Sequence, residues 1–176
     1  MSEDSGMFYS QKISEAMSNP IEKIGSDWML ITSGDTAKFN MMTASWGGAG
    51  FIWNKPSLFV FVRPNRYTFE FLEKRDVFTV SFFAPEYKKA LSFCGSHSGR
   101  DFDKAKECSL TPFATTNGGV AFEESALYFE CRKTYAQDMS EKCFLDKSAL
   151  EKWYGADNPM HKMYVAEILS AMAAEK

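Results

Sequence analysis

The stretch FVRPNRYTFEF places two arginines directly after the apolar run 58–62. Pro64 fixes its own backbone and biases Arg63 toward an extended shape. A guanidinium group binds phosphate oxygens bidentately, and the start of a helix adds unpaired N–H groups and partial positive charge. Arg63 and Arg66, beside a helix that we expect to begin near residue 66, therefore predict a phosphate pocket.

The same arginines have a structural alternative. They could belong to a surface turn in which their partners are the acidic residues that follow, Glu70, Glu73 and Asp76. In either case Asn65 or Thr68 could cap the helix. The local pattern leaves both interpretations open.

A second stretch, NMMTASWGGAGFIWNKP, has polar and apolar residues alternating over 42–46, as in a strand with two different faces. We expect the glycines of GGAG to form a loop, where their small size would let a flat ligand approach the backbone. Trp46 and Trp53 could then enclose that ligand. The alternative is a barrel strand with a tight glycine turn and tryptophans in the core.

A third stretch, CGSHSGRDFDKAKE, contains a Ser-Gly-Arg-Asp turn followed by a short helix that Asp101 or Asp103 could begin. Arg100 and Lys104 could bind another phosphate. The alternative is a charged turn that is simply solvated.

The cysteines and histidines indicate neither a metal site nor a catalytic set formed by protein groups. Cys94 and His97 have a spacing that a metal could use, but the chain has only two histidines and no second cysteine close in sequence. The four cysteines form no Cys-x-x-Cys pair, and we expect free thiols. His161 could contact a ligand, or it could be structural or exposed. No Gly-x-Ser-x-Gly motif marks a nucleophile.

Length and composition limit the function classes. The 176 residues suit one domain, and we expect about the first ten to be loose. With 45% hydrophobic residues, 16 Phe, 7 Tyr and 4 Trp, the chain can build a core or stack on a planar ligand. A net charge of −3 disfavours a broad nucleic-acid surface. No apolar run is long enough to span a membrane, and the polar, acidic start has no export-signal pattern, so we predict a cytoplasmic protein.

Short periodic segments predict a mainly β protein, a β-barrel with short peripheral helices. Residues 57–62 show no polar alternation, which predicts a strand buried on both faces. The segment 161–173 could be a strand or a helix, and Asn-Gly-Gly in 115–122 predicts a hairpin-like turn. The other expected strands are 27–35, 38–46, 76–83 and 126–137, and the expected helices are 66–75, 85–94 and 101–108.

The three stretches together resemble one family. In their order and spacing, Thr-Ala-Ser-Trp, Arg-Pro-x-Arg-Tyr-Thr and Ser-Gly-Arg-Asp-x-Asp-Lys are similar to motifs of the flavin reductase-like, FMN-binding split-barrel family, on its flavoredoxin side. The resemblance covers about residues 20–170. It implies a Greek-key split barrel that forms a homodimer, with FMN near the subunit interface.

The resemblance also implies which residues bind the cofactor. The FMN phosphate would be held by Arg63, Pro64, Asn65, Arg66, Tyr67 and Thr68. The isoalloxazine ring would lie on Met42, Thr43, Ala44, Ser45 and Trp46, mostly on their backbone groups, and against Ser81 and Phe82. The later motif, which would serve the flavin or the nicotinamide donor, comprises Ser98, Gly99, Arg100, Asp101 and Lys104.

By this resemblance the hard chemistry belongs to the flavin. NAD(P)H or a redox protein would supply electrons to FMN, and the flavin would pass them to an acceptor. FMN could stay bound, or free flavin could be the substrate. A non-catalytic flavin-binding electron carrier or sensor is the alternative, and a barrel without a cofactor, whose arginines make only salt bridges, is a weaker one. The residues do not distinguish NADH from NADPH and do not name the acceptor.

Overall fold

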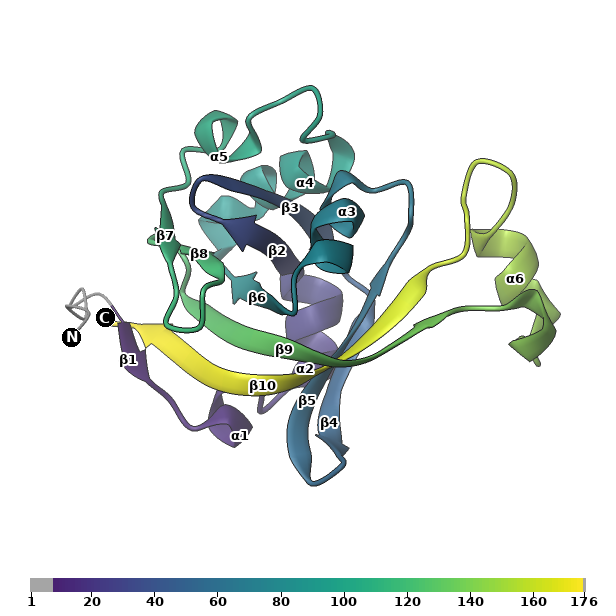
Figure 1. Ribbon diagram of the computed structural model, residues 1–176, viewed down its shortest axis with the longest axis horizontal. Coiled ribbons are helices and arrows are strands. Elements are labelled where there is room, and N and C mark those ends of the chain that lie inside the picture. Colours follow the sequence, from purple (N-terminus) through teal and green to yellow (C-terminus); the bar gives the residue numbers. More distant parts are fainter. Residues whose placement is uncertain (1–7, 176) are drawn as a thin grey trace.

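The computed structural model describes residues 8–175 (Figure 1). The strands are β1 (Phe8–Ser10), β2 (Met29–Asp35), β3 (Lys38–Ala44), β4 (Gly47–Ile52), β5 (Lys55–Val62), β6 (Val77–Phe82), β7 (Pro112–Ala114), β8 (Val120–Phe122), β9 (Leu127–Asp138) and β10 (Lys162–Ala174). The α-helices are α1 (Ile13–Ala16), α2 (Pro20–Glu22), α3 (Tyr67–Lys74), α4 (Lys88–Ser96), α5 (Lys104–Glu107) and α6 (Lys147–Trp153). A π-helical turn spans Lys23–Asp27, and 3₁₀ turns span Pro85–Tyr87 and Glu141–Cys143.

The main sheet is curled into a split barrel. Its strands hydrogen-bond in the order β3-β2-β6-β9-β10-β5-β4, and β1 pairs with β10. β3 and β4 therefore lie at opposite ends of the sheet, yet only Ser45 and Trp46 separate them in the chain. The sheet must curl until these two edges meet, which leaves the barrel split along a seam between them. The predicted mainly β barrel with short peripheral helices is confirmed.

The interior of the barrel is apolar. β5 contributes Leu58, Val60 and Val62, and facing strands contribute side chains such as Ile31 and Phe129, all buried. Along β5 the alternate residues are only partly buried, so the prediction of a strand buried on both faces is wrong. The β5 strand has one face toward the core and one toward the outside of the barrel.

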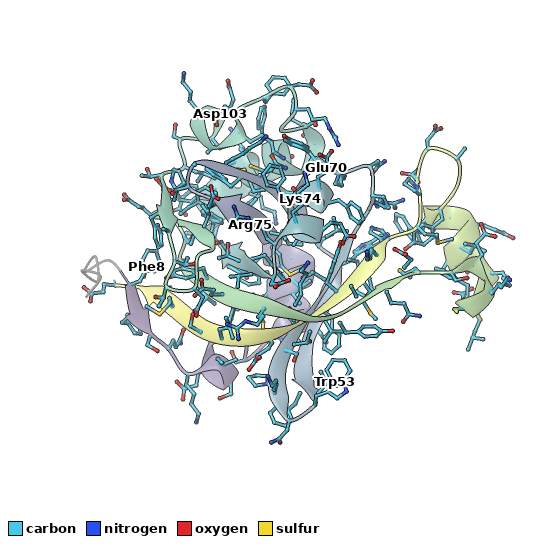
Figure 2. All side chains as sticks on the ribbon, viewed as in Figure 1. Phe8, Trp53, Glu70, Lys74, Arg75 and Asp103 are labelled. Carbon is cyan, nitrogen blue, oxygen red and sulfur yellow. The ribbon has the colours of Figure 1, made fainter. Side chains whose placement is uncertain are left out.

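The glycine-rich segment after β3 is a strand and not the predicted loop. β4 pairs with β5 through a two-residue turn, Trp53 and Asn54, whose φ angles of 49° and 60° fit a type I′ hairpin. A Cβ at Gly47 would lie only 2.7 Å from the Phe59 carbonyl oxygen, so the strand uses its glycines for close approach to β5. Trp53 is thereby placed at the far tip of this hairpin (Figure 2).

The two ends of the chain add to the same sheet. β10 is a strand over Lys162–Ala174, which settles the choice between strand and helix that the sequence left open. Residues 8–10 form β1 on its edge, so the expectation of a loose start is wrong for these three residues, while residues 1–7 lie outside the described part.

Between β9 and β10 the chain leaves the body as an arm, residues 139–161, which carries α6 (Figure 1). The sequence predicted no element there. In residues 8–175, no helix is long and apolar enough to cross a membrane.

Candidate functional site

Two adjoining cavities lie where the seam of the barrel meets α3 and α4. The seam cavity, about 150 Å³, is lined by Met42, Thr43, Ala44, Ser45, Trp46, Phe61, Arg63, Arg66 and His161. The helix cavity, about 120 Å³, is lined by Asn40, Met42, Asn65, Arg66, Tyr67, Thr68, Cys94, Ser96, His97, Ser98, Gly99 and Lys104. Met42 and Arg66 line both, so the two cavities are neighbours. Most of the predicted site residues are thus brought together.

The floor of the seam cavity is an unpaired strand edge. In the described residues β3 pairs on one side only, with β2, so the backbone groups on its other side are free for a ligand. The Thr43 hydroxyl donates to the carbonyl oxygen of Leu91 at 2.6 Å and is therefore committed to α4. Trp46 lies at the mouth of the cavity, 39% exposed. A flat ligand here would contact backbone groups and the indole ring.

Arg63 contacts the arm and not the helix cavity. Its guanidinium donates to the carbonyl oxygens of Pro159 at 3.0 Å and Trp153 at 3.1 Å. It also lies over the ring of Tyr154. In this structure Arg63 therefore stabilises the arm at the rim of the seam cavity, and the phosphate role predicted for it stays a prediction.

His161 closes the seam cavity from the arm side. It is 8% exposed, its ring centroid lies 5.3 Å from that of Trp46, and its Nδ1 is 2.8 Å from the Tyr154 hydroxyl in a hydrogen bond. Burial, and then the positive charges of Arg63 and Arg66, lower the pKa of His161 to about 4. The ring is neutral at pH 7 and offers one donor and one acceptor nitrogen.

Arg66 is the cation at the junction of the two cavities. It is the N-cap residue of α3, and its Nη1 donates to the Gly95 carbonyl oxygen at 2.9 Å. No ion pair in residues 8–175 involves Arg66 or Arg63, so the interpretation in which they pair with Glu70, Glu73 or Asp76 is not what the structure has. The first N–H groups of α3, which have no partner within the helix, lie beside this cation.

Lys104 is the second cation of the helix cavity. Its ammonium group is buried and donates to the carbonyl oxygens of Cys94 at 2.9 Å and His97 at 3.1 Å. Burial is the main cause that lowers its pKa. The third N–H of the ammonium has no protein partner among these bonds, so an anion in the cavity could accept it.

Asn40 and Gly99 hold the α3 side of the helix cavity in place. The Asn40 amide donates to Thr68 Oγ1 at 2.7 Å, at the start of α3. Gly99 packs directly on Asn40, because a Cβ at Gly99 would lie 1.8 Å from Asn40 Oδ1. Neither Asn40 nor Phe61 carries a sequence signal for the site, since their position depends on strands that pair only in the fold.

Several predicted residues lie elsewhere. Ser81 and Phe82 are buried within β6 and line neither cavity, and Pro64 lies in the turn before α3. Arg100 forms an ion pair with Glu70 and lies over the Tyr67 ring, outside the helix cavity. Trp53, at the hairpin tip, does not enclose the site.

The described cysteines are free thiols, as predicted. The fold nevertheless brings a second cysteine to Cys94, because Cys94 Sγ and Cys108 Sγ are 3.8 Å apart. Within residues 8–175 no three His, Cys, Asp or Glu side chains gather as a metal site would require.

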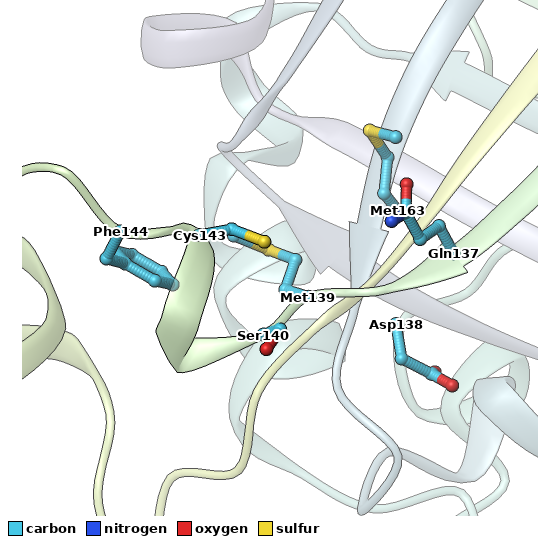
Figure 3. A pocket seen from close by; sticks show the side chains of 7 residues that line it. All are labelled: Gln137, Asp138, Met139, Ser140, Cys143, Phe144 and Met163. Carbon is cyan, nitrogen blue, oxygen red and sulfur yellow. The ribbon is translucent and has the colours of Figure 1, made fainter.

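Larger cavities lie outside this pair. One of about 420 Å³ borders the helix cavity, with Lys38, Phe71 and Arg100 among its lining residues. Another of about 210 Å³ lies at the root of the arm, lined by Gln137, Asp138, Met139, Ser140, Cys143, Phe144 and Met163 (Figure 3). This cavity has no cationic side chain in its lining, so it offers no counter-charge to a phosphate.

The fold and the two cavities define a split-barrel protein whose site suits a flat ring joined to a phosphate. The sequence matches the family profile described as flavin reductase like domain over residues 21–175. The chain belongs to the flavin reductase-like family. No curated protein gives a significant match.

Solved structures share this fold at low sequence identity. A flavoredoxin from Methanosarcina acetivorans is 23% identical, with 82% of this chain and 67% of that chain covered and a TM-score of 0.65. An FMN-binding domain of a flavin reductases-like enzyme from Shewanella baltica is 17% identical, covering 94% and 76%, with a TM-score of 0.68. A Streptomyces globisporus NADH:FAD oxidoreductase in complex with NAD and FAD fragments is 17% identical, covering 85% and 77%, with a TM-score of 0.60.

Proposed function

We propose that this chain is an FMN-binding oxidoreductase that passes electrons from a nicotinamide nucleotide or a protein donor through the flavin to an acceptor. The observation that carries the proposal is the position of Arg66. It lines both cavities, so one cation sits between a site for a ring and a site for a phosphate. The structural neighbours include an FMN-binding domain and a protein in complex with NAD and FAD fragments, which supports this ligand class.

The residues present fit FMN. Arg66, Lys104 and the first N–H groups of α3 would hold the phosphate, each as a donor to its oxygens. The free edge of β3 would hold the ring, and its N–H groups would stabilise negative charge that develops there. Bound FMN would supply hydride and electron transfer, which no protein side chain provides.

His161 and Trp46 would shape the open side of the ring site. The neutral imidazole, held by Tyr154, can donate or accept one hydrogen bond there without adding charge. The indole would cover part of the ring face and exclude water. Arg63 would keep His161 and Trp46 in position, because it binds the arm that contacts them.

The proposal includes a homodimer. Phe51 and Trp53 on the β4–β5 hairpin are 69% and 57% exposed, and Trp53 packs near Tyr135 of β9. Exposed aromatics grouped on one side of a barrel are typical of a protein interface. Light scattering coupled to size-exclusion chromatography would measure the mass, and a monomer at micromolar concentration would contradict this part.

The test of function is an absorption spectrum of the purified protein with FMN, before and after anaerobic NADH or NADPH. Retained flavin bands that bleach on addition of the nicotinamide support the oxidoreductase. Flavin bands that stay unbleached with both nucleotides favour the alternative, an electron carrier fed by a protein, or a sensor. A protein that takes up no FMN contradicts the proposal. The cytoplasmic location stays a prediction.

A further inference from the structure

Two cysteines lie at the two ends of a segment that forms one wall of the helix cavity, and their thiols are in contact. Cys94 lies in α4 and is buried, and Cys108 is the C-cap residue of α5 and is partly exposed. Their Sγ atoms are 3.8 Å apart. The segment between them carries Ser98, Gly99 and Lys104, which line the cavity.

The two thiols have no part in the proposed electron path. Cys94 lines the helix cavity, Cys108 does not, and neither lines the seam cavity where the ring would bind. The other cysteines are placed differently: Cys131 is buried in the sheet and Cys143 is exposed on the arm. The Cys94–Cys108 contact is thus a distinct site, defined by two sulfur atoms from different helices.

We propose that Cys94 and Cys108 form a reversible disulfide that closes residues 94–108 into a covalent loop, and that the oxidised protein releases FMN more slowly than the reduced protein. The statement about release rests on the proposed function. The statement about the disulfide rests on the sulfur geometry alone.

The oxidant is a hydroperoxide, for which hydrogen peroxide is the simplest case. The more exposed Cys108 sulfur attacks one peroxide oxygen, the O–O bond breaks, and a sulfenic acid and water form. The Cys94 sulfur then attacks the Cys108 sulfur, the S–O bond breaks, and the disulfide and a second water form. Two thiols are oxidised and one peroxide is reduced to two waters. A dithiol reductant reverses the step by exchange.

The local structure sets how readily this happens. The sulfurs must close from 3.8 Å to about 2 Å, and we expect the partly exposed Cys108 side chain to make this movement. Burial raises the pKa of both thiols, that of Cys94 to about 12. The positive charge of Lys104 lowers the pKa of both thiols, and the negative charge of Glu107 raises the pKa of Cys108. Oxidation should therefore be slow at neutral pH and faster near pH 9, where more thiolate is present.

The disulfide would act on the cavity through Lys104. The ammonium group of Lys104 donates to the Cys94 carbonyl oxygen, while the Cys108 N–H donates to the Lys104 carbonyl oxygen. The Lys104 side chain therefore binds the backbone of Cys94, and the Lys104 backbone binds the backbone of Cys108. A covalent link between residues 94 and 108 would hold α5 on α4 and keep this cation in the cavity, since it removes the open conformations of the loop.

The experiment uses the full chain treated with hydrogen peroxide near pH 9, with and without a dithiol reductant. Intact mass should fall by about 2 Da, and peptide mapping should find residues 94 and 108 linked, in the wild type and in Cys143→Ser but not in Cys108→Ser. FMN release, followed by the recovery of free-flavin fluorescence after dilution, should slow by roughly tenfold on oxidation in the first two proteins only.

The outcomes separate the two parts of the proposal. Oxidation of Cys108 to sulfinic acid with no linked peptide overturns the disulfide. A linked peptide with equal release rates overturns the effect on FMN. A chain that binds no FMN in either state overturns the proposed function and the effect on release, while the linked peptide still supports the disulfide. The variant Cys108→Ala repeats the control if Cys108→Ser does not fold.

Discussion

Arg66 donates from Nη1 to the carbonyl oxygen of Gly95 at 2.9 Å, across 29 positions of the sequence. The bond joins the N-cap of α3 to the last turn of α4, and so it fixes the two helices that form the helix cavity. The cation is held by a backbone group and has no carboxylate partner among the described ion pairs. Its charge is therefore available to a phosphate.

Replacing Arg66 with Ala should weaken FMN binding by about 10- to 100-fold, since a charge-assisted hydrogen bond is worth about 1.5–3 kcal/mol. Titration of the apoprotein with FMN, followed by flavin fluorescence, measures this. Arg100→Ala is the matched control, because Arg100 is a nearby arginine that already pairs with Glu70. Equal losses in both variants would show a general charge effect and not a phosphate contact.

Gly99→Ala should weaken FMN binding while the protein stays folded. The added Cβ would overlap Asn40 Oδ1, so Asn40 must move and release its bond to Thr68 at the start of α3. We expect a loss of about tenfold in affinity. Gly25→Ala, where a Cβ meets nothing within 4 Å, is the control. Unchanged affinity in Gly99→Ala, with circular dichroism also unchanged, would contradict the assigned role of Asn40.

Arg63→Ala should loosen the arm more than it weakens binding of the phosphate. The variant loses two bonds to the carbonyl oxygens of Trp153 and Pro159. Limited proteolysis within residues 139–161 should become about tenfold faster, because cleavage follows the population of the open form. Arg75→Ala removes an exposed ion pair far from the arm and serves as the control. An arm that is cleaved at the wild-type rate would refute this role of Arg63.

The neutral state of His161 predicts how stability depends on pH. Its pKa is about 4 in the folded protein, below its ordinary value of 6.5. The unfolded chain therefore binds one more proton between these values. The contribution of His161 to stability is complete above pH 6.5 and is lost as the pH falls toward 4, by about 1.4 kcal/mol per pH unit.

Urea unfolding of the wild type and of His161→Gln over pH 4–8 tests this. The wild type should lose stability more steeply than the variant below pH 6.5, and the two should run parallel above it. Parallel curves over the whole range would mean that His161 is not held neutral.

Glu130→Gln should lower the free energy of unfolding by about 2 kcal/mol. The buried Glu130 carboxylate accepts hydrogen bonds from Thr115, from both nitrogens of Asn117 and from Gly119 in the turn after β7. A glutamine amide has an NH₂ group where these donors need an oxygen. The partly exposed Glu124, which accepts from Thr111, provides the control variant Glu124→Gln. Similar losses in both would contradict the buried role.

Sequence patterns predicted the strands and helices that have strong periodicity. Residues 57–62 and 66–75 were predicted from their apolar spacing, and the structure has β5 and α3 at these places. The GGAG segment was misassigned because glycine normally disfavours strands. In the structure Gly48 and Gly50 lie against the Phe59 ring. That contact follows from the register of the β4–β5 hairpin, which single-residue preferences do not contain.

The candidate site was predictable where residue type alone determines the chemistry. Arg66 and Lys104 are cations next to helix starts, and both line the helix cavity. The contacts of Arg63 with the arm could not be predicted, because its partners lie about 90 residues away in a segment that the sequence did not reveal. Ser81 and Phe82 are in a strand as expected, but their burial depends on neighbouring strands.

The order of strands in the sheet bears on how the protein is made. In the described residues, β5 pairs only with β4 and with β10, so the β4–β5 hairpin joins the rest of the sheet through β10, which is synthesised after the other described strands. Phe61 on that hairpin and Met42 on β3 therefore come to line one cavity only after residues 162–174 have been synthesised. A nascent chain should therefore acquire its ligand-binding competence only after β10 has been made.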